Sequence, residues 1–200
     1  MSIGEWAFYW CTSLTGIWVD RDNNNYSSDA SGVLFDKNMT ALIQCPGGFS
    51  GAYTIPDNVT SIGEQAFHDC TSLTSVTIPD SVTSIGDGAF ASCTSLTGIW
   101  VAEGNNDYSS DASGVLFNKD KTTLVQCPGA FREYTIPDSV TSICNHAFYG
   151  CESLTSVTIP NSVTSIGSYA FYNCTSLTDV YYAGSEAQWK AISISSAGND

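Results

Sequence analysis

The eight cysteines of this 200-residue chain have its most reactive side chains. Cysteine thiols can serve as zinc ligands, disulfide partners or nucleophiles. Five of them open the same pattern, Cys-x-Ser-Leu, at Cys11, Cys70, Cys93, Cys151 and Cys174, and two others, Cys45 and Cys127, precede a proline. A residue type that recurs at one structural position fills the same slot in each repeat, and free cysteine is among the most buried residue types. The spacing therefore predicts a ladder of buried thiols, with disulfides between adjacent turns as the main alternative.

Metal chemistry has little support in the residue spacing. The chain has no Cys-x-x-Cys, and Cys144 and Cys151 have no zinc partners at finger spacing. Segments 20–26 and 103–108 are rich in Asp and Asn, whose oxygens could hold Ca²⁺. Neither segment has the spacing of a known calcium loop, and this composition is ordinary turn chemistry. We expect no metal and no cofactor.

The two histidines, His68 and His146, are the candidates for acid–base chemistry. They occupy different places within the repeat described below, so the sequence predicts no matched pair and a surface or hydrogen-bonded role for each. Nucleophilic catalysis needs a base and an orienting partner beside the nucleophile. The sequence proposes no such set, and we expect a protein that is not an enzyme.

An internal repeat positions all of these residues. Residues 61–73 recur 23 residues later at 84–96. Aligning each turn on its last apolar strand residue gives seven positions, at Val19, Ile55, Ile78, Val101, Ile136, Ile159 and Tyr182. Their spacings of 36, 23, 23, 35, 23 and 23 residues define a larger unit of 81 to 82 residues that occurs twice. Such a period predicts a stack of similar turns, in contrast to a fold with one active-site cleft.

Each short turn reads as one strand followed by a compact return. In residues 73–79, alternation predicts that Val76 and Ile78 face the core while Thr77 faces outward, and Pro79 ends the strand. Residues 87–93 are long enough for about one turn of helix. The two long turns add 12 or 13 residues. Their β-rich runs predict β-hairpin insertions near 32–46 and 114–128.

Two repeated patterns support a family resemblance. The pattern L-x-x-V-x-I-P-x-S-V-T-S-I-G-x-x-A-F-x-x-C-x-S-L and the longer N-x-x-Y-S-S-x-x-x-G-V-L-F-x-K-x-x-T-x-L-x-Q-C-P element resemble the BspA-like leucine-rich-repeat proteins over nearly the whole chain. The resemblance implies an α/β, β-rich, right-handed leucine-rich-repeat solenoid, with a parallel sheet on the concave side and short helical turns on the convex side. We expect a single domain over residues 1–200 with about seven turns. By analogy, the resemblance also implies a bacterial or protist surface protein used in adhesion or recognition.

The chain is acidic, with 6 Lys and Arg against 20 Asp and Glu and a net charge of −14. This balance opposes binding to nucleic acid or to anionic lipid. No apolar run approaches the ~18 residues that a membrane span needs, and no signal peptide opens the sequence. We expect no membrane insertion by this segment, and an extracellular or cell-surface location for the native full-length protein.

The two ends of the stack differ in sequence. Residues 185–193 predict a C-terminal capping helix, in which Ser185 and Gln188 form a capping box while Trp189 and Ile192 cover the stack. The other end, near Met1, begins within a repeat and has no polar cap. That end predicts either end-to-end self-association or further repeats upstream.

The resemblance places a ligand on the concave sheet. The outward strand residues there are Trp18, Thr54, Thr77, Trp100, Thr135, Thr158 and Tyr181. The aromatic members fall on the first, fourth and seventh strands, roughly 14 Å apart along one sheet. Exposed aromatic rings stack on sugars or anchor protein partners, so the expected partner is a host or matrix protein, or a glycan. The alternative is that duplication copied one tolerated Trp whose ring the hairpin covers.

Two other functions stay open at this level. The stack could be a structural spacer that presents another domain and itself binds nothing, or a scaffold for an enzyme domain elsewhere in the native protein. The full-length sequence would discriminate, because a long uninterrupted array without varied concave residues favours the spacer.

Overall fold

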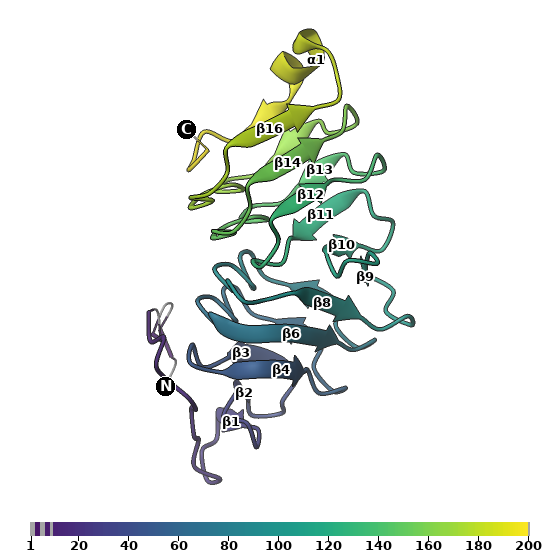
Figure 1. Cartoon of the computed structure of the whole chain (residues 1–200). Helices are drawn as coiled ribbons and strands as arrows, with labels where there is room; N and C mark the ends of the chain where they lie inside the picture. The colour runs from purple at the N-terminus through teal and green to yellow at the C-terminus, as the bar shows by residue number, and fades with distance from the viewer. Residues whose placement is uncertain (1–2, 5–6, 9, 200) are drawn as a thin grey trace.

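The structure is a computed structural model that describes residues 3–4, 7–8 and 10–199. The chain climbs from its N-terminal turns to a short helix at the C-terminal end (Figure 1). It is a β-rich solenoid of about six turns. Each turn passes through a ladder strand, a short strand and a run of turns. We call the corresponding sides of the stack the ladder side, the short-strand side and the turn side.

The ladder side carries parallel strands in two sheets of three. The first sheet contains β4 (Ser50–Thr54), β6 (Ser72–Ile78) and β8 (Gly98–Val101), and the second contains β12 (Glu133–Thr135), β14 (Ser156–Ile159) and β16 (Asp179–Tyr182). Figure 1 shows the first sheet in the lower half of the stack and the second in the upper half. The expected single sheet with seven strands is therefore corrected. The sheet is divided between β8 and β12, and residues 16–19 are not a strand.

The insertions explain the division of the ladder sheet. At the edge of β8, the Ile99 amide donates to the Gly114 carbonyl at 2.8 Å, and the Val101 amide donates to Ser110 Oγ at 2.8 Å. Both bonds recur in the first copy, at 2.8 and 2.9 Å. Backbone amides that the insertion has already paired do not need a neighbouring ladder strand. Each insertion therefore interrupts the ladder where it leaves the stack.

The short-strand side also holds two sheets. One contains β1 (Tyr26–Ser28), β2 (Leu34–Asp36), β3 (Ala41–Gln44), β5 (Ser61–Ile62) and β7 (Ser84–Ile85); the other contains β9 (Tyr108–Ser110), β10 (Leu116–Asn118), β11 (Thr123–Gln126), β13 (Ser142–Ile143), β15 (Ser165–Ile166) and β17 (Ser193–Ile194). The expected hairpins are the antiparallel pairs β2–β3 and β10–β11. Each gains a third antiparallel strand, β1 or β9, that the sequence did not predict. Parallel pairing of β3 with β5 and of β11 with β13 joins each insertion to the stack.

The turn side has consecutive β-turns where short helical turns were expected. In residues 63–70, every second amide donates three residues back, and the amides between them donate to carbonyls of the next repeat. Gln65 and Asp69 have φ of 54° and 59°, and this left-handed conformation cannot continue a right-handed helix. Residues 144–151 show the same alternation. Half of these amides thus form the turn, and the other half bind one repeat to the next.

Aromatic rings from successive turns stack in the interior. Phe67 lies on Phe90 with ring centroids 5.0 Å apart, and Phe148 lies on Phe171 at 4.8 Å. Because the first three of these rings are almost fully buried, each gains the full hydrophobic free energy of a phenyl side chain, roughly 1.5–3 kcal/mol. The repeated Ala-Phe pair of the turn side therefore supplies a large share of the core.

The predicted ladder of buried thiols is confirmed in part, because Cys11 in the first turn is exposed and Cys174 is half-buried. All eight lie in the described part of the chain and are free, and five are buried: Cys45, Cys70, Cys93, Cys127 and Cys151. Cys93 Sγ donates to the Phe67 carbonyl at 3.0 Å, and burial raises the pKa of this thiol. Burial likewise raises the pKa of the half-buried Cys174 to about 12. Protonated thiols bonded to backbone carbonyls are packing groups, and a nucleophile or metal ligand would need the thiolate.

The C-terminal end is closed by α1 (Glu186–Ala191), which lies within the expected range 185–193. Ser185 and Gln188 make the predicted capping box. Trp189 packs against Tyr182 of β16 with ring centroids 5.2 Å apart. No described helix is long and apolar enough to cross a bilayer. Met1 lies outside the described residues, and association through that end stays a prediction.

Candidate functional site

The residues expected to face a ligand form two rows on the ladder side. Strand register places Thr54, Thr77 and Trp100 in one row and Thr135, Thr158 and Tyr181 in the other. All are exposed except Thr158, which is half-buried. Trp18 holds the equivalent position of the first turn, is exposed, and belongs to neither sheet. The expected regular spacing of the three aromatic residues along one continuous sheet is therefore wrong.

Trp100 rests on two glycines. A Cβ added to Gly98 would lie 2.7 Å from two carbons of the indole ring, and one added to Gly114 would lie 3.2 Å from the same ring. Gly114 also has φ +83, which favours glycine by itself. The glycines let the ring lie directly against the backbone, and the residue stays 42% exposed. The result is a supported aromatic surface that faces solvent.

The first copy repeats this arrangement. Beneath Trp18, a Cβ on Gly16 or Gly32 would lie 2.8 or 3.2 Å from the ring, and Trp18 is 70% exposed. Sequence reasoning missed these supporting glycines, although Gly-Ile-Trp-Val at both 16–19 and 98–101 carried the signal. In each copy one insertion glycine, Gly32 or Gly114, lies against the ring, and the ring stays exposed to solvent.

An aspartate in each insertion fixes the loop beneath the tryptophan. Asp111 accepts two hydrogen bonds from amides of its own loop at 2.9 Å each, and a third from Tyr134 Oη at 2.7 Å. Tyr134 belongs to β12, so the loop beneath Trp100 is tied to the second ladder sheet. Burial and the Asp111 carboxylate raise the pKa of the Tyr134 hydroxyl, which keeps it a donor. Tyr53 and Asp29 make the matching bond at 2.6 Å.

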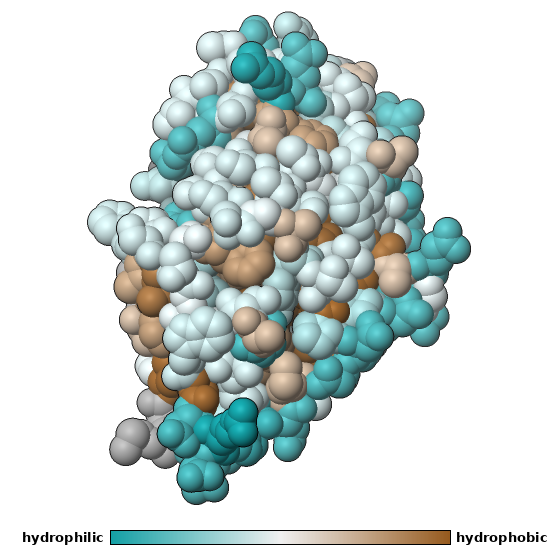
Figure 2. Space-filling view, turned by 60° about the horizontal axis from the view of Figure 1, so that its bottom comes forward, coloured by the Kyte–Doolittle hydropathy of each residue, from teal (hydrophilic) through white to brown (hydrophobic). Residues whose placement is uncertain are grey.

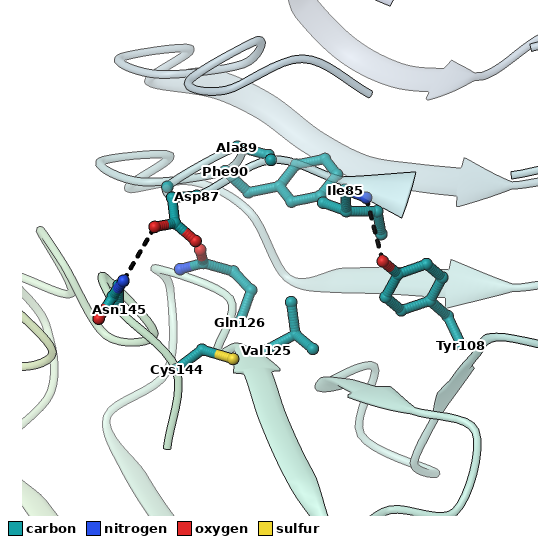
Figure 3. A pocket seen from close by; sticks show the side chains of 11 residues that line it. Ile85, Asp87, Ala89, Phe90, Tyr108, Val125, Gln126, Cys144 and Asn145 are labelled. Carbon is teal, nitrogen blue, oxygen red and sulfur yellow. Dashed lines mark hydrogen bonds between the residues drawn. The ribbon is translucent and has the colours of Figure 1, made fainter. Parts of the chain in front are cut away.

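A second candidate is a small cavity where the two copies meet (Figure 3). Its volume is about 120 Å³, and β7, β11 and the turn at 86–90 contribute to its lining. Figure 3 shows the two hydrogen bonds at its margins. The Ile85 amide donates to Tyr108 Oη at 3.0 Å, and Asn145 Nδ2 donates to Asp87 Oδ2 at 2.9 Å. These bonds bridge the seam where β7 and β11 do not pair.

The seam cavity is poorly suited to chemistry. Burial, reinforced by the charge of Asp87, raises the pKa of the Cys144 thiol, so the nucleophilic thiolate is disfavoured. The buried Gln126 carboxamide donates to two backbone carbonyls. A counterpart recurs at the N-terminal end, where the Ile3 amide donates to Tyr26 Oη at 3.0 Å. A feature present at the same place in both copies is a property of the repeat junction.

A third candidate is a groove on the turn side, called here the His–Tyr groove. It is lined by Glu64, Gln65, His68, His146, Tyr149, Tyr169 and Tyr172. The rings of His68 and His146 lie 5.7 and 5.5 Å from the same Tyr149 ring, a proximity that the sequence did not predict. They do hold different places in their repeats. They share one groove because the turn between them carries the small residues Gly88 and Ala91 at these places.

The Asp- and Asn-rich segments use their oxygens to build turns. Asn105 Oδ1 accepts from two following amides at 2.9 and 2.8 Å, and Asn23 Oδ1 does the same at 2.9 and 3.0 Å. These bonds agree with the turn interpretation of 20–26 and 103–108. Across the described residues, no group of three or more His, Cys, Asp or Glu could hold a metal ion.

Figure 2 brings the N-terminal end of the stack forward. Most of this face is pale, the colour of intermediate hydropathy, and the brown apolar areas are separate from one another. The large exposed hydrophobic residues of the molecule include Trp18, Trp100 and Tyr181 on the ladder side and Tyr169 and Tyr172 on the turn side. Exposed aromatic rings are therefore among the apolar contact points on both sides.

Comparison with known proteins identifies the repeat. The family model described as a BspA type leucine rich repeat region matches six copies, over residues 51–114 and 120–193. No curated protein matches the chain. The matched ranges begin after the first insertion and leave out residues 115–119 of the second.

Among solved structures, the chain is similar to a leucine rich cell surface protein from Faecalibacterium prausnitzii A2-165, with 35% identity, a TM-score of 0.59, and coverage of 96% of this chain and 48% of that one. It is also similar to a leucine-rich repeat protein from Eubacterium ventriosum ATCC 27560, with 31% identity, a TM-score of 0.56, and coverage of 68% and 43%. The pneumococcal vaccine antigen PcpA, at 24% identity, a TM-score of 0.55 and coverage of 66% and 39%, supports the fold alone. The chain thus spans about half the length of these three structures, or less.

Proposed function

The chain belongs to the BspA-type leucine-rich-repeat family, and from this premise we propose that it is a surface recognition or adhesion module. It binds a glycan or a protein through its ladder side and carries out no catalysis. A similar structure is named as a cell surface protein, which supports an extracellular or cell-surface location. The net charge of −14 supports a partner other than nucleic acid or anionic lipid.

The observation that carries this proposal is the pair of glycine-supported tryptophans. An indole ring held against the backbone has little side-chain freedom left to lose on binding. Its exposed part can stack on the apolar face of a sugar ring. The threonines beside Trp100, Thr77 and Thr54, add hydroxyl groups that donate and accept hydrogen bonds. This combination favours a glycan, with a protein segment as the second ligand class.

The proposal includes a right-handed winding and a single domain over residues 1–200. Parallel ladder strands are joined by crossovers through the short strands, and such crossovers are right-handed in about 98% of cases. Leu116 of the second copy packs within the core cluster of the first. That contact supports one continuous core.

A structural spacer is the alternative function. The observation in its favour is that four ladder positions carry the same residue, at Thr54, Thr77, Thr135 and Thr158. Threonine is a good strand former and needs no ligand to explain it. A spacer would tolerate loss of both tryptophans without a change in any interaction.

A binding screen tests the proposal. The parent chain is screened against a glycan array and a panel of host-matrix proteins, beside Trp18→Ala, Trp100→Ala and the double variant. Each single change is expected to lower affinity about three- to tenfold, the value of one aromatic stacking contact. Tyr172→Ala, on the turn side, is the matched control and should leave the affinity unchanged.

Two outcomes would count against the ladder side. If the parent binds a target and neither tryptophan change weakens binding, the ligand lies elsewhere on the molecule. If the parent binds nothing in either panel while full-length arrays still present their other domains, the spacer is the better account.

A further inference from the structure

The His–Tyr groove joins the two copies of the larger unit. Its volume is about 330 Å³. Side chains come from the turn runs at 63–70 and 144–151, and they approach each other over Gly88, where an added Cβ would lie 3.4 Å from His146 and 3.7 Å from Gln65. The turn run at 167–174 adds Tyr169 and Tyr172. The groove is therefore built from residues that differ between turns, unlike the ladder.

The tyrosines form an aromatic corner. Tyr169 and Tyr172 stand at 77° to each other with centroids 5.6 Å apart. Tyr149 lies 5.2 Å from Tyr172 on the other side, and His146 stacks on Tyr169 at 5.5 Å with an interplanar angle of 6°. Tyr169 and Tyr172 are 39% and 47% exposed. Ring faces and edges thus border a groove that is open to solvent.

The charges around the groove are negative. The Glu64 carboxylate lines it, Asp69 Oδ2 lies 3.1 Å from His68 Nδ1, and Asp87 acts on His146 from the neighbouring turn. None of the lining residues is Lys or Arg. Burial lowers the pKa of His146 below its ordinary value, although the carboxylates of Asp87 and Glu64 oppose the shift. The groove therefore has fixed negative charge and a largely neutral His146 at pH 7.

We propose that the His–Tyr groove is a binding site for an arginine side chain of a basic partner segment. Its guanidinium stacks on the exposed Tyr172 ring and donates to the Glu64 carboxylate. This site is distinct from the ladder side and does not depend on the ligand proposed there. The net charge of −14 would favour encounter with a basic segment.

The groove chemistry favours a guanidinium over other ligands. A guanidinium is planar, stacks on aromatic faces and presents a fork of N–H donors that matches a carboxylate. A lysine ammonium can use the ring quadrupole, but it is a compact, strongly hydrated charge and offers no planar fork. A neutral sugar can donate hydroxyl hydrogen bonds to a carboxylate, but it lacks the charge attraction that a guanidinium gains from the surrounding carboxylates.

The test uses small probes on the whole chain. N-acetyl-L-arginine amide is titrated at pH 7.5 and low salt, with binding followed by NMR shifts of the tyrosine rings. N-acetyl-L-citrulline amide, a neutral analogue of the same shape, and N-acetyl-L-lysine amide are titrated in parallel. We expect a dissociation constant of about 1–10 mM for the arginine probe. The citrulline probe should bind at least about tenfold more weakly, with lysine between them.

Three variants locate the site. Glu64→Gln removes the charge and keeps the shape, and should weaken the arginine probe about fivefold. Tyr172→Ala removes one wall of the corner and should weaken it about three- to tenfold. Trp100→Ala, on the ladder side, is the control and should change the affinity less than twofold. Circular dichroism and thermal unfolding verify that each variant is folded.

Equal binding of the arginine and citrulline probes would overturn the proposal, because charge would then play no part. Binding that survives both Glu64→Gln and Tyr172→Ala would place the cation elsewhere and would also overturn it. Absence of arginine binding in the folded parent has the same consequence. None of these results bears on the ladder-side screen, so the two proposals fail separately.

Discussion

The ladder side and the turn side use the same repeat in different ways. On the ladder side the two copies support an exposed tryptophan in the same way, with Trp18 and Trp100 each resting on two glycines. On the turn side, equivalent positions hold His68, Ala91, Tyr149 and Tyr172 in successive runs. Identical positions produce a repeated surface. Diverged positions produce a groove at the junction of the copies.

This difference shows that the ladder-side surface depends on the backbone architecture, whereas the turn-side surface depends on the side chains of individual turns. The tryptophan supports lie where the insertion pairs with the ladder backbone, so they are tied to the architecture. The groove depends on small side chains at Gly88 and Ala91 and on bulky ones beside them. The following variants separate the two surfaces, beginning with a change that should affect both.

Phe148→Ala should have the largest effect. The ring is fully buried and stacks on Phe171 at 4.8 Å, so its removal leaves a cavity and should cost about 3–5 kcal/mol of unfolding free energy. Urea unfolding followed by circular dichroism measures the change. The exposed Tyr172→Ala is the comparison, expected within about 0.5 kcal/mol of the parent. A loss below about 1 kcal/mol for Phe148→Ala would mean that the stacked core is misassigned.

Gly114→Ala should come next and should disturb the ladder side. The new Cβ would lie 2.7 Å from the Gly98 backbone and 3.2 Å from Trp100, at φ +83. The left-handed backbone and the overpacking together should lower the unfolding free energy by about 2–4 kcal/mol. The change should also alter tryptophan emission.

Gly51→Ala is the matched control for that change. Gly51 has φ +86, yet a Cβ there meets nothing within 4 Å. Gly51→Ala should lower the unfolding free energy only by the cost of placing alanine in the left-handed conformation, about 1–2 kcal/mol. It should leave tryptophan emission unchanged. Equal costs for the two glycines would show that the contact between Gly114 and Trp100 is unimportant.

Tyr134→Phe and Tyr53→Phe test whether the two copies are equivalent. Each removes a hydroxyl that donates to an insertion aspartate, at 2.7 Å to Asp111 and 2.6 Å to Asp29. Loss of a hydrogen bond to a charged acceptor should cost about 1.5–3 kcal/mol in either copy. Thermal unfolding of the two variants should shift by similar amounts. A difference above about 1 kcal/mol would show that the insertions are anchored differently.

The smallest effect concerns pH and the groove. Because the pKa of His146 is lowered in the folded state, the unfolded chain binds more protons as pH falls below about 6.5. Stability that involves His146 is therefore present above pH 6.5 and is lost as pH falls toward its folded pKa. His146→Gln should flatten the pH dependence of the unfolding free energy below about pH 6.5. An unchanged slope would show that another group titrates there.

The sequence predicted those features that depend on the residues of a single turn. Alternation around Thr77 sets the outward ladder positions, Ser185 and Gln188 set the capping box, and the recurrence of Cys93 and its equivalents sets the thiol column. The first two depend on residues within a few positions of one another, and the third depends only on the period of the repeat. Local pattern was therefore enough.

Contacts between distant turns could not be predicted in this way. The division of the ladder sheet follows from bonds of Ile99 and Val101 to an insertion loop. The support of Trp100 requires Gly114, and His68 meets Tyr149 across a turn that lies between them. Each of these pairs is separated by many residues, and a repeat pattern states only that equivalent positions stack.

The most direct test of the recognition surface is an NMR titration of the five indole N–H signals. The ligand is the tightest binder found in the glycan and matrix-protein screen, and the signals are assigned with single Trp→Phe variants. We expect the signals of Trp18 and Trp100 to shift together and to saturate with one dissociation constant, while the signal of Trp189, which packs on Tyr182, stays fixed. Shifts confined to Trp189, or saturable binding with no change at Trp18 and Trp100, would contradict a ladder-side site.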